Sequence, residues 1–176
     1  NMIIAISGTA GSGKSTIAKM LAKKLKYKHY SMGDFQREIA KEKKISIEEL
    51  GELEKKDPTI DKMVDERQKQ LGKENNFVID SWLSSYFIPD SYRIFMDADL
   101  EERAKRILER EPEHYKNLKE AMGQIKKREE TNRARWKKFY GYDFRDKNNY
   151  HLNIDTSGKN IDAVFKLVYN GVKNAK

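Results

Sequence analysis

Short apolar runs alternate with longer amphipathic segments from one end of the chain to the other. Apolar runs of this length are typical of strands that are buried on both faces of a parallel sheet. Strands that alternate with helices form right-handed βαβ units. The pattern therefore predicts a three-layer α/β/α fold around a five-stranded parallel sheet. The predicted strands are residues 2–7, 29–31, 77–80, 93–97 and 150–155.

Helical periodicity fills the segments between these runs, and local signals mark where several helices begin. Ser46 followed by Glu49 is a capping box, and Asp57 followed by Pro58 combines an N-cap with a first-turn proline. The predicted helices are residues 14–25, a helix beginning at 34, then 47–54, 58–71, 100–109, 116–140 and 161–172.

Composition limits the class of protein. The chain has 176 residues, of which 38% are hydrophobic and 36% charged, which suits one globular domain. It has no cysteine, no apolar run long enough to span a membrane and no basic lead-in to its first apolar run. We therefore expect a cytoplasmic protein without disulfides, membrane segment or signal peptide.

The net charge of +8 suggests an anionic partner, such as a nucleotide or a nucleic acid. The alternative is that most of this charge is ordinary surface, because lysine and glutamate are mixed along most helices.

A phosphate-binding loop follows the first predicted strand. The sequence GTAGSGKS at residues 8–15 fits the pattern G-x-x-x-x-G-K-[ST], and it lies between a strand and a helix as the mechanism requires. Its backbone N–H groups and the helix N-terminus can bind phosphates, Lys14 can reach the β- and γ-phosphates, and Ser15 can ligate Mg²⁺. The nucleotide-binding prediction covers Gly8, Thr9, Ala10, Gly11, Ser12, Gly13, Lys14, Ser15 and Thr16.

The loop alone does not decide the reaction, because switches, motors and small kinases all use it. The chain lacks the N-K-x-D segment that usually reads guanine in GTPases.

Later segments resemble the nucleoside monophosphate kinases, most closely the archaeal-type cytidylate kinases. The resemblance covers nearly the whole chain. It rests on the loop, on SMGDFQR at residues 31–37, and on DPTIDKMVDERQ, FVID, IFMDADLEERAKRI and KREETNRARWKKFYGYD further on. It implies a P-loop kinase that uses ATP and Mg²⁺. It also implies one domain with a core (residues 2–33, 76–111 and 150–176), an acceptor insert (about 34–75) and a basic lid (about 112–149).

The resemblance assigns acceptor binding to the insert. Gly33, Asp34 and Arg37 belong to its S-x-G-D-x-x-R motif, in which the arginine binds the acceptor phosphate, as a guanidinium fork can. The alternative for Arg37 is a surface ion pair with Asp34. Asp61 and Asp65 lie four residues apart on one helix face and could accept from the amine of a cytosine, or could belong to a solvated helix face.

One position departs from the family. Asp80, at the end of a strand, can hold the Mg²⁺ shell together with Ser15. A Gly-Arg pair usually follows in the relatives, but Ser81 and Trp82 follow here. An indole cannot replace a guanidinium. Trp82 could line the base pocket with Tyr86 or could belong to the core.

The lid carries the clustered positive charge. By resemblance, Arg128, Arg133 and Arg135 stabilise the transferring phosphoryl group together with Lys14, and lid closure excludes water. Arg106 and Arg110 are weaker candidates, and a basic helix that binds RNA is the alternative. No histidine needs a catalytic role, because the acceptor is already an anionic oxygen.

We therefore expect a monomeric kinase that moves the γ-phosphate of ATP to a nucleoside monophosphate, most favourably CMP or dCMP. An adenylate-kinase-like or other small-molecule kinase, a nucleotide-dependent RNA-binding or assembly factor, and an inactive relative remain alternatives.

Overall fold

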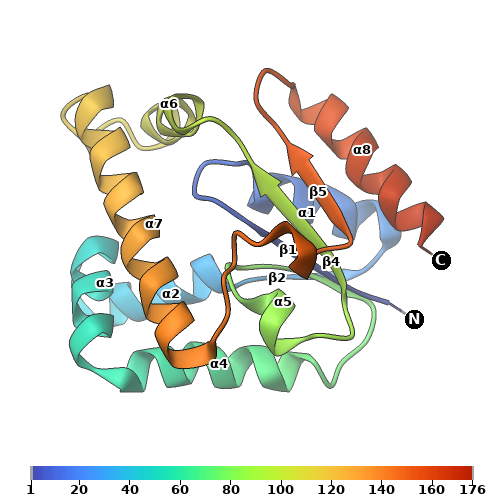
Figure 1. The fold of residues 1–176 in the computed structure, drawn as a ribbon, viewed down its shortest axis with the longest axis horizontal. Helices are drawn as coiled ribbons and strands as arrows, with labels where there is room; N and C mark the ends of the chain where they lie inside the picture. Colours follow the sequence, from blue (N-terminus) through green and yellow to red (C-terminus); the bar gives the residue numbers. More distant parts are fainter. Residues whose placement is uncertain (1, 176) are drawn as a thin grey trace.

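The apolar runs form one parallel sheet in the computed structural model, which describes residues 2–175 (Figure 1). The strand order is β2-β3-β1-β4-β5, and each predicted strand is present within two residues of its expected bounds. The strands are β1 (Ile3–Gly8), β2 (Lys28–Ser31), β3 (Phe77–Asp80), β4 (Tyr92–Asp97) and β5 (Leu152–Asp155).

The helices also follow the predicted order, with two short additions. Sequence patterns missed α5 and a 3-10 turn at Lys147–Asn149, since both are too short to show periodicity. Helix α2 begins two residues before position 34, because the Ser31 hydroxyl accepts a hydrogen bond from the Asp34 amide as its N-cap. The helices are α1 (Lys14–Leu25), α2 (Met32–Lys43), α3 (Ile47–Lys56), α4 (Pro58–Leu71), α5 (Ser84–Phe87), α6 (Leu100–Arg110), α7 (Leu118–Tyr140) and α8 (Ile161–Asn174).

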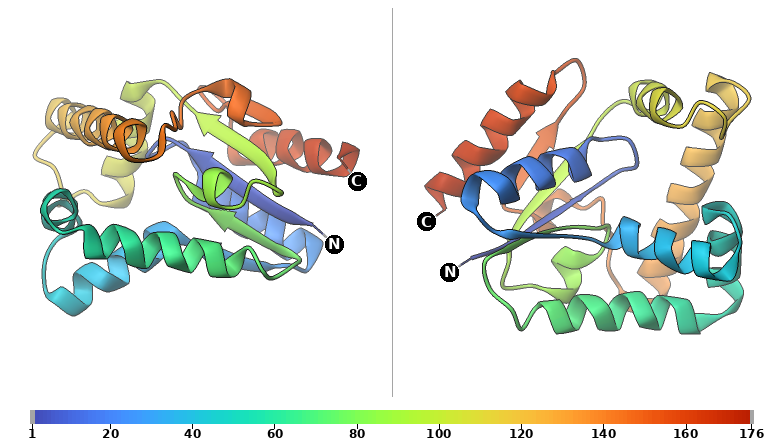
Figure 2. Two further views of the ribbon diagram at one scale, coloured as in Figure 1. Left: turned by 60° about the horizontal axis from the view of Figure 1, so that its bottom comes forward. Right: turned by 180° about the vertical axis from the view of Figure 1, so that it is seen from behind.

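The sheet is buried on both faces, which gives the three-layer α/β/α fold. Side chains alternate along a strand, so Ile4 and Ile6 of β1 pack against α1 and α8, whereas Ala5 faces α2, α3 and α4. Figure 2 shows α1 and α8 on one side of the sheet and α2 and α4 on the other. This double cover explains why the three central strands, β1, β3 and β4, are mostly apolar.

An aromatic cluster fixes the C-terminal half of α7 to the second face of the sheet. Trp136 of α7 packs edge-on against Trp82, with ring centroids 5.3 Å apart, and both contact Phe144. Phe95 of β4 stacks on Tyr150 at 4.9 Å. The long basic helix is thus held at one end, and its other half extends over the carboxyl edge of the sheet (Figure 1).

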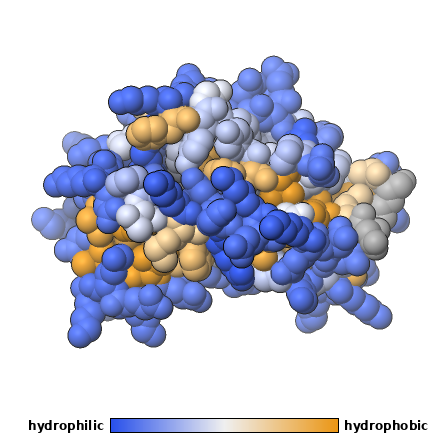
Figure 3. Space-filling model, turned by 90° about the horizontal axis from the view of Figure 1, so that it is seen from below, coloured by the Kyte–Doolittle hydropathy of each residue, from blue (hydrophilic) through white to orange (hydrophobic). Residues whose placement is uncertain are grey.

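All five strands point the same way, so their carboxyl ends meet at one edge. The phosphate loop, Ser31, Asp80 and Asp97 lie there, where α/β folds of this kind bind ligands. The surface seen from below Figure 1 is mostly hydrophilic, with apolar atoms visible between charged side chains (Figure 3). Within residues 2–175, no helix combines the length and apolar character needed to cross a membrane.

Candidate active site

The phosphate loop needs glycine where its backbone turns against other chain segments. Gly11 has a φ of +79°, and a Cβ there would lie 2.6 Å from the carbonyl oxygen of Arg103. Gly13 has a φ of +91° and precedes α1. Only glycine adopts such angles without strain, so the motif's spacing fixes the shape of the loop.

The start of α1 is open to an anion. Gly13 provides no side-chain cap, so the first-turn N–H groups of this helix are left to an outside acceptor. Lys14, on the first turn, faces the same space. Burial lowers the pKa of Lys14 to about 8, helped by the positive charges of Arg128, Arg110 and Arg37, while Asp80 opposes the shift.

One cavity of about 1000 Å³ extends from this loop to the acceptor insert and the lid helix. Gly8, Thr9 and Ser12 of the same loop are buried and are not part of the wall. The cavity is lined by most of the predicted site residues, namely Ala10, Gly11, Gly13, Lys14, Ser15, Thr16, Gly33, Asp34, Arg37, Asp61, Asp65, Asp80, Trp82, Arg128 and Arg135.

Asp80 is the centre of a polar cluster at the end of β3. The hydroxyls of Ser15 and Ser31 donate to its Oδ1 over 2.8 and 3.0 Å, and Nε2 of His29 lies 2.6 Å from its Oδ2. Burial alone would raise the pKa of Asp80. The hydrogen bonds from His29 and Ser15 and the charge of Lys14 outweigh burial, so this pKa lies below its ordinary value and the carboxylate is ionised.

Ser15 and Asp80 are suited to Mg²⁺. An ionised carboxylate and a hydroxyl 2.8 Å apart beside the phosphate loop are hard oxygen donors of the kind Mg²⁺ prefers, and this ion usually takes its other ligands from phosphate and water. Within residues 2–175, no cluster of three or more acidic, histidine or cysteine side chains is placed to hold a metal ion.

The acceptor motif lies on the same cavity wall at the start of α2. Arg37 is half exposed, contacts the carboxylate of Asp34 and lies over Gly33, where a Cβ would come within 3.4 Å of its guanidinium. The surface ion pair considered from the sequence is therefore present. Because the pair borders the cavity, an incoming phosphate could displace Asp34.

The predicted base-binding carboxylates also face the cavity, and each contacts the lid helix. Asp61 lies 3.5 Å from Nη2 of Arg135, and Asp65 accepts from the hydroxyl of Tyr140. Burial raises the pKa of both carboxyls. Asp61 and Asp65 are therefore partly buried against α7 and do not belong to a fully solvated helix face.

Two nearby side chains lie outside the cavity: Arg67, two residues after Asp65 on α4, and Tyr86, which was considered as a partner of Trp82 in the base pocket. Arg67 stacks over the ring of Tyr30 at 5.7 Å, and Tyr86 is exposed against Phe87 and Tyr140. Neither is part of the cavity wall.

Trp82 belongs both to the core and to the cavity. One side of its ring packs in the aromatic cluster, while Lys14 Nζ and Arg128 Cζ lie 6.0 and 5.7 Å from its centroid. An electron-rich face under two cations stabilises their positive charge. The indole thus occupies the position of the expected arginine and leaves the nearby cations in place.

The three arginines predicted to belong to the lid do not all face the cavity. Arg128 and Arg135 line the cavity, but Arg133 does not. Its guanidinium forms two hydrogen bonds to Asp143, of 2.8 and 2.7 Å, and borders a separate hollow of about 250 Å³. Of the weaker candidates, Arg110 lines the cavity, whereas Arg106 donates to the carbonyl of Gly11 from behind the loop.

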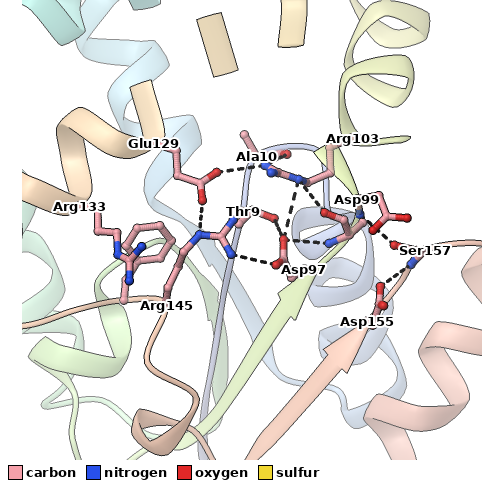
Figure 4. Close-up of polar contacts among 12 residues, drawn as sticks. Thr9, Ala10, Asp97, Asp99, Arg103, Glu129, Arg133, Arg145, Asp155 and Ser157 are labelled. Atoms are coloured by element: carbon pink, nitrogen blue, oxygen red, sulfur yellow. Dashed lines mark hydrogen bonds and ion pairs between the residues drawn. The ribbon is translucent and has the colours of Figure 1, made fainter. Parts of the chain in front are cut away.

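Sequence reasoning missed a charged network behind the phosphate loop (Figure 4). Thr9 donates to Asp97 over 2.7 Å, and Arg103 donates to the carbonyl of Ala10. Glu129 of the lid helix contacts both Arg103 and Arg145. Arg145 in turn donates a hydrogen bond of 3.0 Å to Asp97, which completes the network. Thr9 and Ala10 belong to the loop motif, but no motif links them to the other residues, because contacting members of the network lie up to 93 positions apart.

Together, a phosphate loop at the head of α1, a carboxylate suited to Mg²⁺ and an arginine-lined cavity under a basic helix define a P-loop kinase of small molecules. Two solved structures share the fold. An uncharacterized protein from Eubacterium ventriosum gives a TM-score of 0.72 at 20% identity, covering 98% of this chain and 99% of that one. The shikimate kinase of Acinetobacter baumannii gives 0.65 at 14%, covering 99% and 94%.

Sequence comparison narrows the class to a family. The profile of the Cytidylate kinase-like family matches residues 3–158. The cytidylate kinase of Thermococcus kodakarensis is 38% identical over 95% of this chain and 86% of its own length, and that of Aeropyrum pernix is 35% identical over 96% and 97%. The chain belongs to the Cytidylate kinase-like family. It is an ATP-dependent nucleoside monophosphate kinase.

Proposed function

We propose that this kinase transfers the γ-phosphate of ATP to CMP or dCMP, giving ADP and CDP or dCDP. The observation that carries the proposal is the single cavity that joins the phosphate loop, Arg37 of the acceptor motif and the carboxylates of Asp61 and Asp65. A donor triphosphate and an acceptor monophosphate can therefore lie end to end within one enclosure. The cytidylate kinase relatives support the choice of base.

The donor phosphates bind to the loop. The open N–H groups of α1 and the ammonium of Lys14 hold them, and Arg110 and Arg128 add positive charge on the facing wall. Arg37 binds the phosphate of the acceptor. The acceptor oxygen is already anionic and attacks the γ-phosphorus in line, so the protein positions the reactants and neutralises charge without a general base.

Ser15 and Asp80 would hold Mg²⁺. When bound, the ion offsets the negative charge that develops on the phosphate oxygens. Ser31 and His29 orient Asp80 from behind. Arg133 can take part in transfer only after its guanidinium leaves Asp143.

The test is an ADP-release assay with ATP and Mg²⁺ against CMP, dCMP, UMP, AMP and GMP. Turnover with CMP or dCMP well above the others is expected. A protein that binds ATP but produces no diphosphate from CMP or dCMP would contradict the proposal.

We also propose that the enzyme acts as a monomer in the cytoplasm, where its nucleotide substrates are found. Within one chain, the cavity already joins the phosphate loop, Arg37 and Arg128. Size-exclusion chromatography and cell fractionation test these two points.

A further inference from the structure

The layer formed by α1 and α8 carries positive charge that is not mixed with negative charge. The chain has no acidic residue before Asp34, whereas residues 14–31 contain six lysines. The other long helices all contain at least one acidic residue, but α1 contains none. Six exposed lysines of this layer form what we call the basic face, namely Lys23, Lys24, Lys26, Lys28, Lys166 and Lys173.

An aromatic pair lies within the basic face, where α1 packs beside α8 (Figure 2). Lys24 Nζ from α1 and Lys173 Nζ from α8 lie 5.7 and 5.6 Å from the ring centroid of Tyr169. The ring of Phe165 stacks on Tyr169 with centroids 5.9 Å apart and an interplanar angle of 14°. Two ammonium groups from different helices therefore share one half-buried aromatic ring.

Helix dipoles offset only part of this charge. Three of the six lysines lie in the last turn of α1 or α8, where the dipole favours cations. Each helix end is equivalent to about half a negative charge, so the two ends together balance about one lysine. Within residues 2–175, the lysines that pair with carboxylates are Lys55, Lys105 and Lys137, which lie on other helices. The remaining charges repel one another, and an external polyanion would relieve this repulsion.

The basic face is separate from the active site. Helices α1 and α8 both start near the carboxyl edge of the sheet and run back to its amino edge (Figure 2). Their C-terminal turns therefore lie at the opposite edge from the phosphate loop, and none of the six lysines lines the cavity. A partner bound there would leave the cavity open to nucleotides.

We propose that the basic face binds single-stranded RNA, as a function in addition to phosphoryl transfer. The lysines contact phosphates, and an unpaired base stacks on the exposed part of the Tyr169 ring. Lys24 and Lys173 then move from the ring to the phosphates on either side of that base. A duplex supplies phosphates but no free base, so a single strand fits this arrangement better.

An anionic membrane fits the basic face less well, because the face has no apolar anchor. The large hydrophobic side chains of α8 that are exposed are Ile161 and Leu167. Leu167 is two residues from Tyr169 and points about 160° away from it around the helix. Ile161 lies in the first turn, at the other end of α8 from Lys173. Membrane-surface helices combine basic residues with an inserted apolar face.

The first experiment measures binding of a labelled 12-nucleotide oligouridylate by fluorescence anisotropy, with a non-hydrolysable ATP analogue filling the donor site. The variant is Lys24→Gln/Lys28→Gln/Lys173→Gln. We expect its affinity for the RNA to fall at least tenfold. The slope of log affinity against log salt should become shallower by about 2, because each phosphate contact with a single strand contributes about 0.7. The affinity for the ATP analogue and the circular dichroism spectrum should not change.

The matched control removes the same charge from exposed positions of α2 and α4. Lys41→Gln/Lys43→Gln/Lys62→Gln should bind the RNA within twofold of the wild type. Equal losses in the two triple variants would mean that binding follows net charge alone, which overturns the proposal.

A third variant tests the lid helix as the alternative RNA site. Lys126→Gln/Lys137→Gln/Lys138→Gln removes three exposed charges from α7 and should keep most of the RNA affinity. A loss confined to this variant would place the RNA on the lid and overturn the proposal.

The second experiment tests stacking at Tyr169. Tyr169→Leu keeps an apolar side chain against the core but removes the ring, so the affinity for oligouridylate should fall at least about fivefold. Binding of heparin, a polyanion without bases, should not change. An unchanged RNA affinity would overturn the stacking role, and tighter binding of the wild type to phosphatidylglycerol vesicles than to RNA would overturn the choice of partner. None of these measurements depends on which acceptor the kinase phosphorylates.

Discussion

At the scale of single residues, His29 acts on the site through Asp80. Its Nε2 lies 2.6 Å from Oδ2, opposite the oxygen that accepts from Ser15 and Ser31. A histidine in this place fixes the carboxylate so that its other oxygen faces the metal position. No sequence pattern assigns this role to His29, because the contact depends on the pairing of β2 with β3.

The first prediction concerns His29→Ala. The Mg²⁺ concentration needed for half-maximal activity should rise about tenfold, as loss of groups that orient a metal ligand commonly causes, while activity at saturating Mg²⁺ falls little. Titration of activity with Mg²⁺ measures this. His151→Ala, which removes a ring stacked on Tyr92, is the control. An unchanged Mg²⁺ requirement would show that Asp80 does not need His29.

The second prediction concerns Trp82, the position at which this chain departs from the family pattern. Its ring packs 5.3 Å from Trp136 and 5.2 Å from Phe144, so Trp82→Ala opens a gap in a partly buried cluster. The free energy of unfolding should fall by about 2–3 kcal/mol, below the loss typical of a fully buried tryptophan. Trp82→Phe should recover most of this loss. Urea denaturation measures both, and equal stability of the two variants would contradict the packing role.

At the scale of elements, α7 links the two halves of the active site. Glu129, near its middle, contacts Arg103 behind the phosphate loop, while Arg135 and Tyr140 contact Asp61 and Asp65 of the insert. The helix carries the lid arginines on the same stretch. The position of α7 therefore depends on contacts both behind the phosphate loop and with α4.

The third prediction removes the link to the phosphate loop. Glu129→Gln leaves Arg103 and Arg145 without their shared partner, and Arg103 is 4% exposed. Breaking a buried ion pair on one side costs about 3–5 kcal/mol, and we expect about 3 because Asp97 remains near both guanidinium groups. Thermal and chemical unfolding measure the loss. Glu130→Gln makes the same change at the next residue, which is exposed, and should change stability little.

The fourth prediction follows from three carboxyl groups that lie between α3, α4 and α7. Burial raises the pKa of Glu54, Asp61 and Asp65, so the folded state binds more protons than the unfolded state between the ordinary carboxyl pKa and the raised one. Stability from these groups is therefore lost as the pH rises through that window.

The comparison variant is Asp61→Asn, which lacks one of these titrating groups. As the pH rises above the ordinary aspartate pKa of about 4, the wild type should lose stability relative to this variant. Unfolding midpoints measured across the window test the sign, with the exposed Asp90→Asn as control. A gain of wild-type stability with rising pH would contradict it.

Sequence patterns could predict the elements well because their signals are local. The central strands are apolar runs, Ser46 and Glu49 form the expected capping box, and Pro58 begins α4 as expected. The site was predictable only where a motif carries it, as in the phosphate loop. Glu54, Glu129 and His29 act through partners on other elements, so only the folded arrangement reveals them.

At the scale of the whole molecule, the division into core, acceptor insert and lid remains a prediction. The lid helix contacts the core through Glu129 and the insert through Arg135. Binding to both sides therefore restrains one helix from two directions, and each substrate should favour the closed arrangement by its contacts in that state.

The fifth prediction is that ATP and CMP together slow amide hydrogen exchange in α7 more than the combined effects of either alone. ATP should hold the phosphate loop, which Arg103 contacts and links to Glu129, and CMP should fill the cavity that Asp61, Asp65 and Arg135 line. Each substrate therefore removes part of the freedom that the other must restrain. Exchange measured by mass spectrometry, with a non-hydrolysable ATP analogue, tests this. The buried strand β1 is the internal control, since its exchange should follow global unfolding. If ATP alone gives the full protection of α7, the lid responds only to the core, and the link between α7 and the insert carries no coupling between the two substrates.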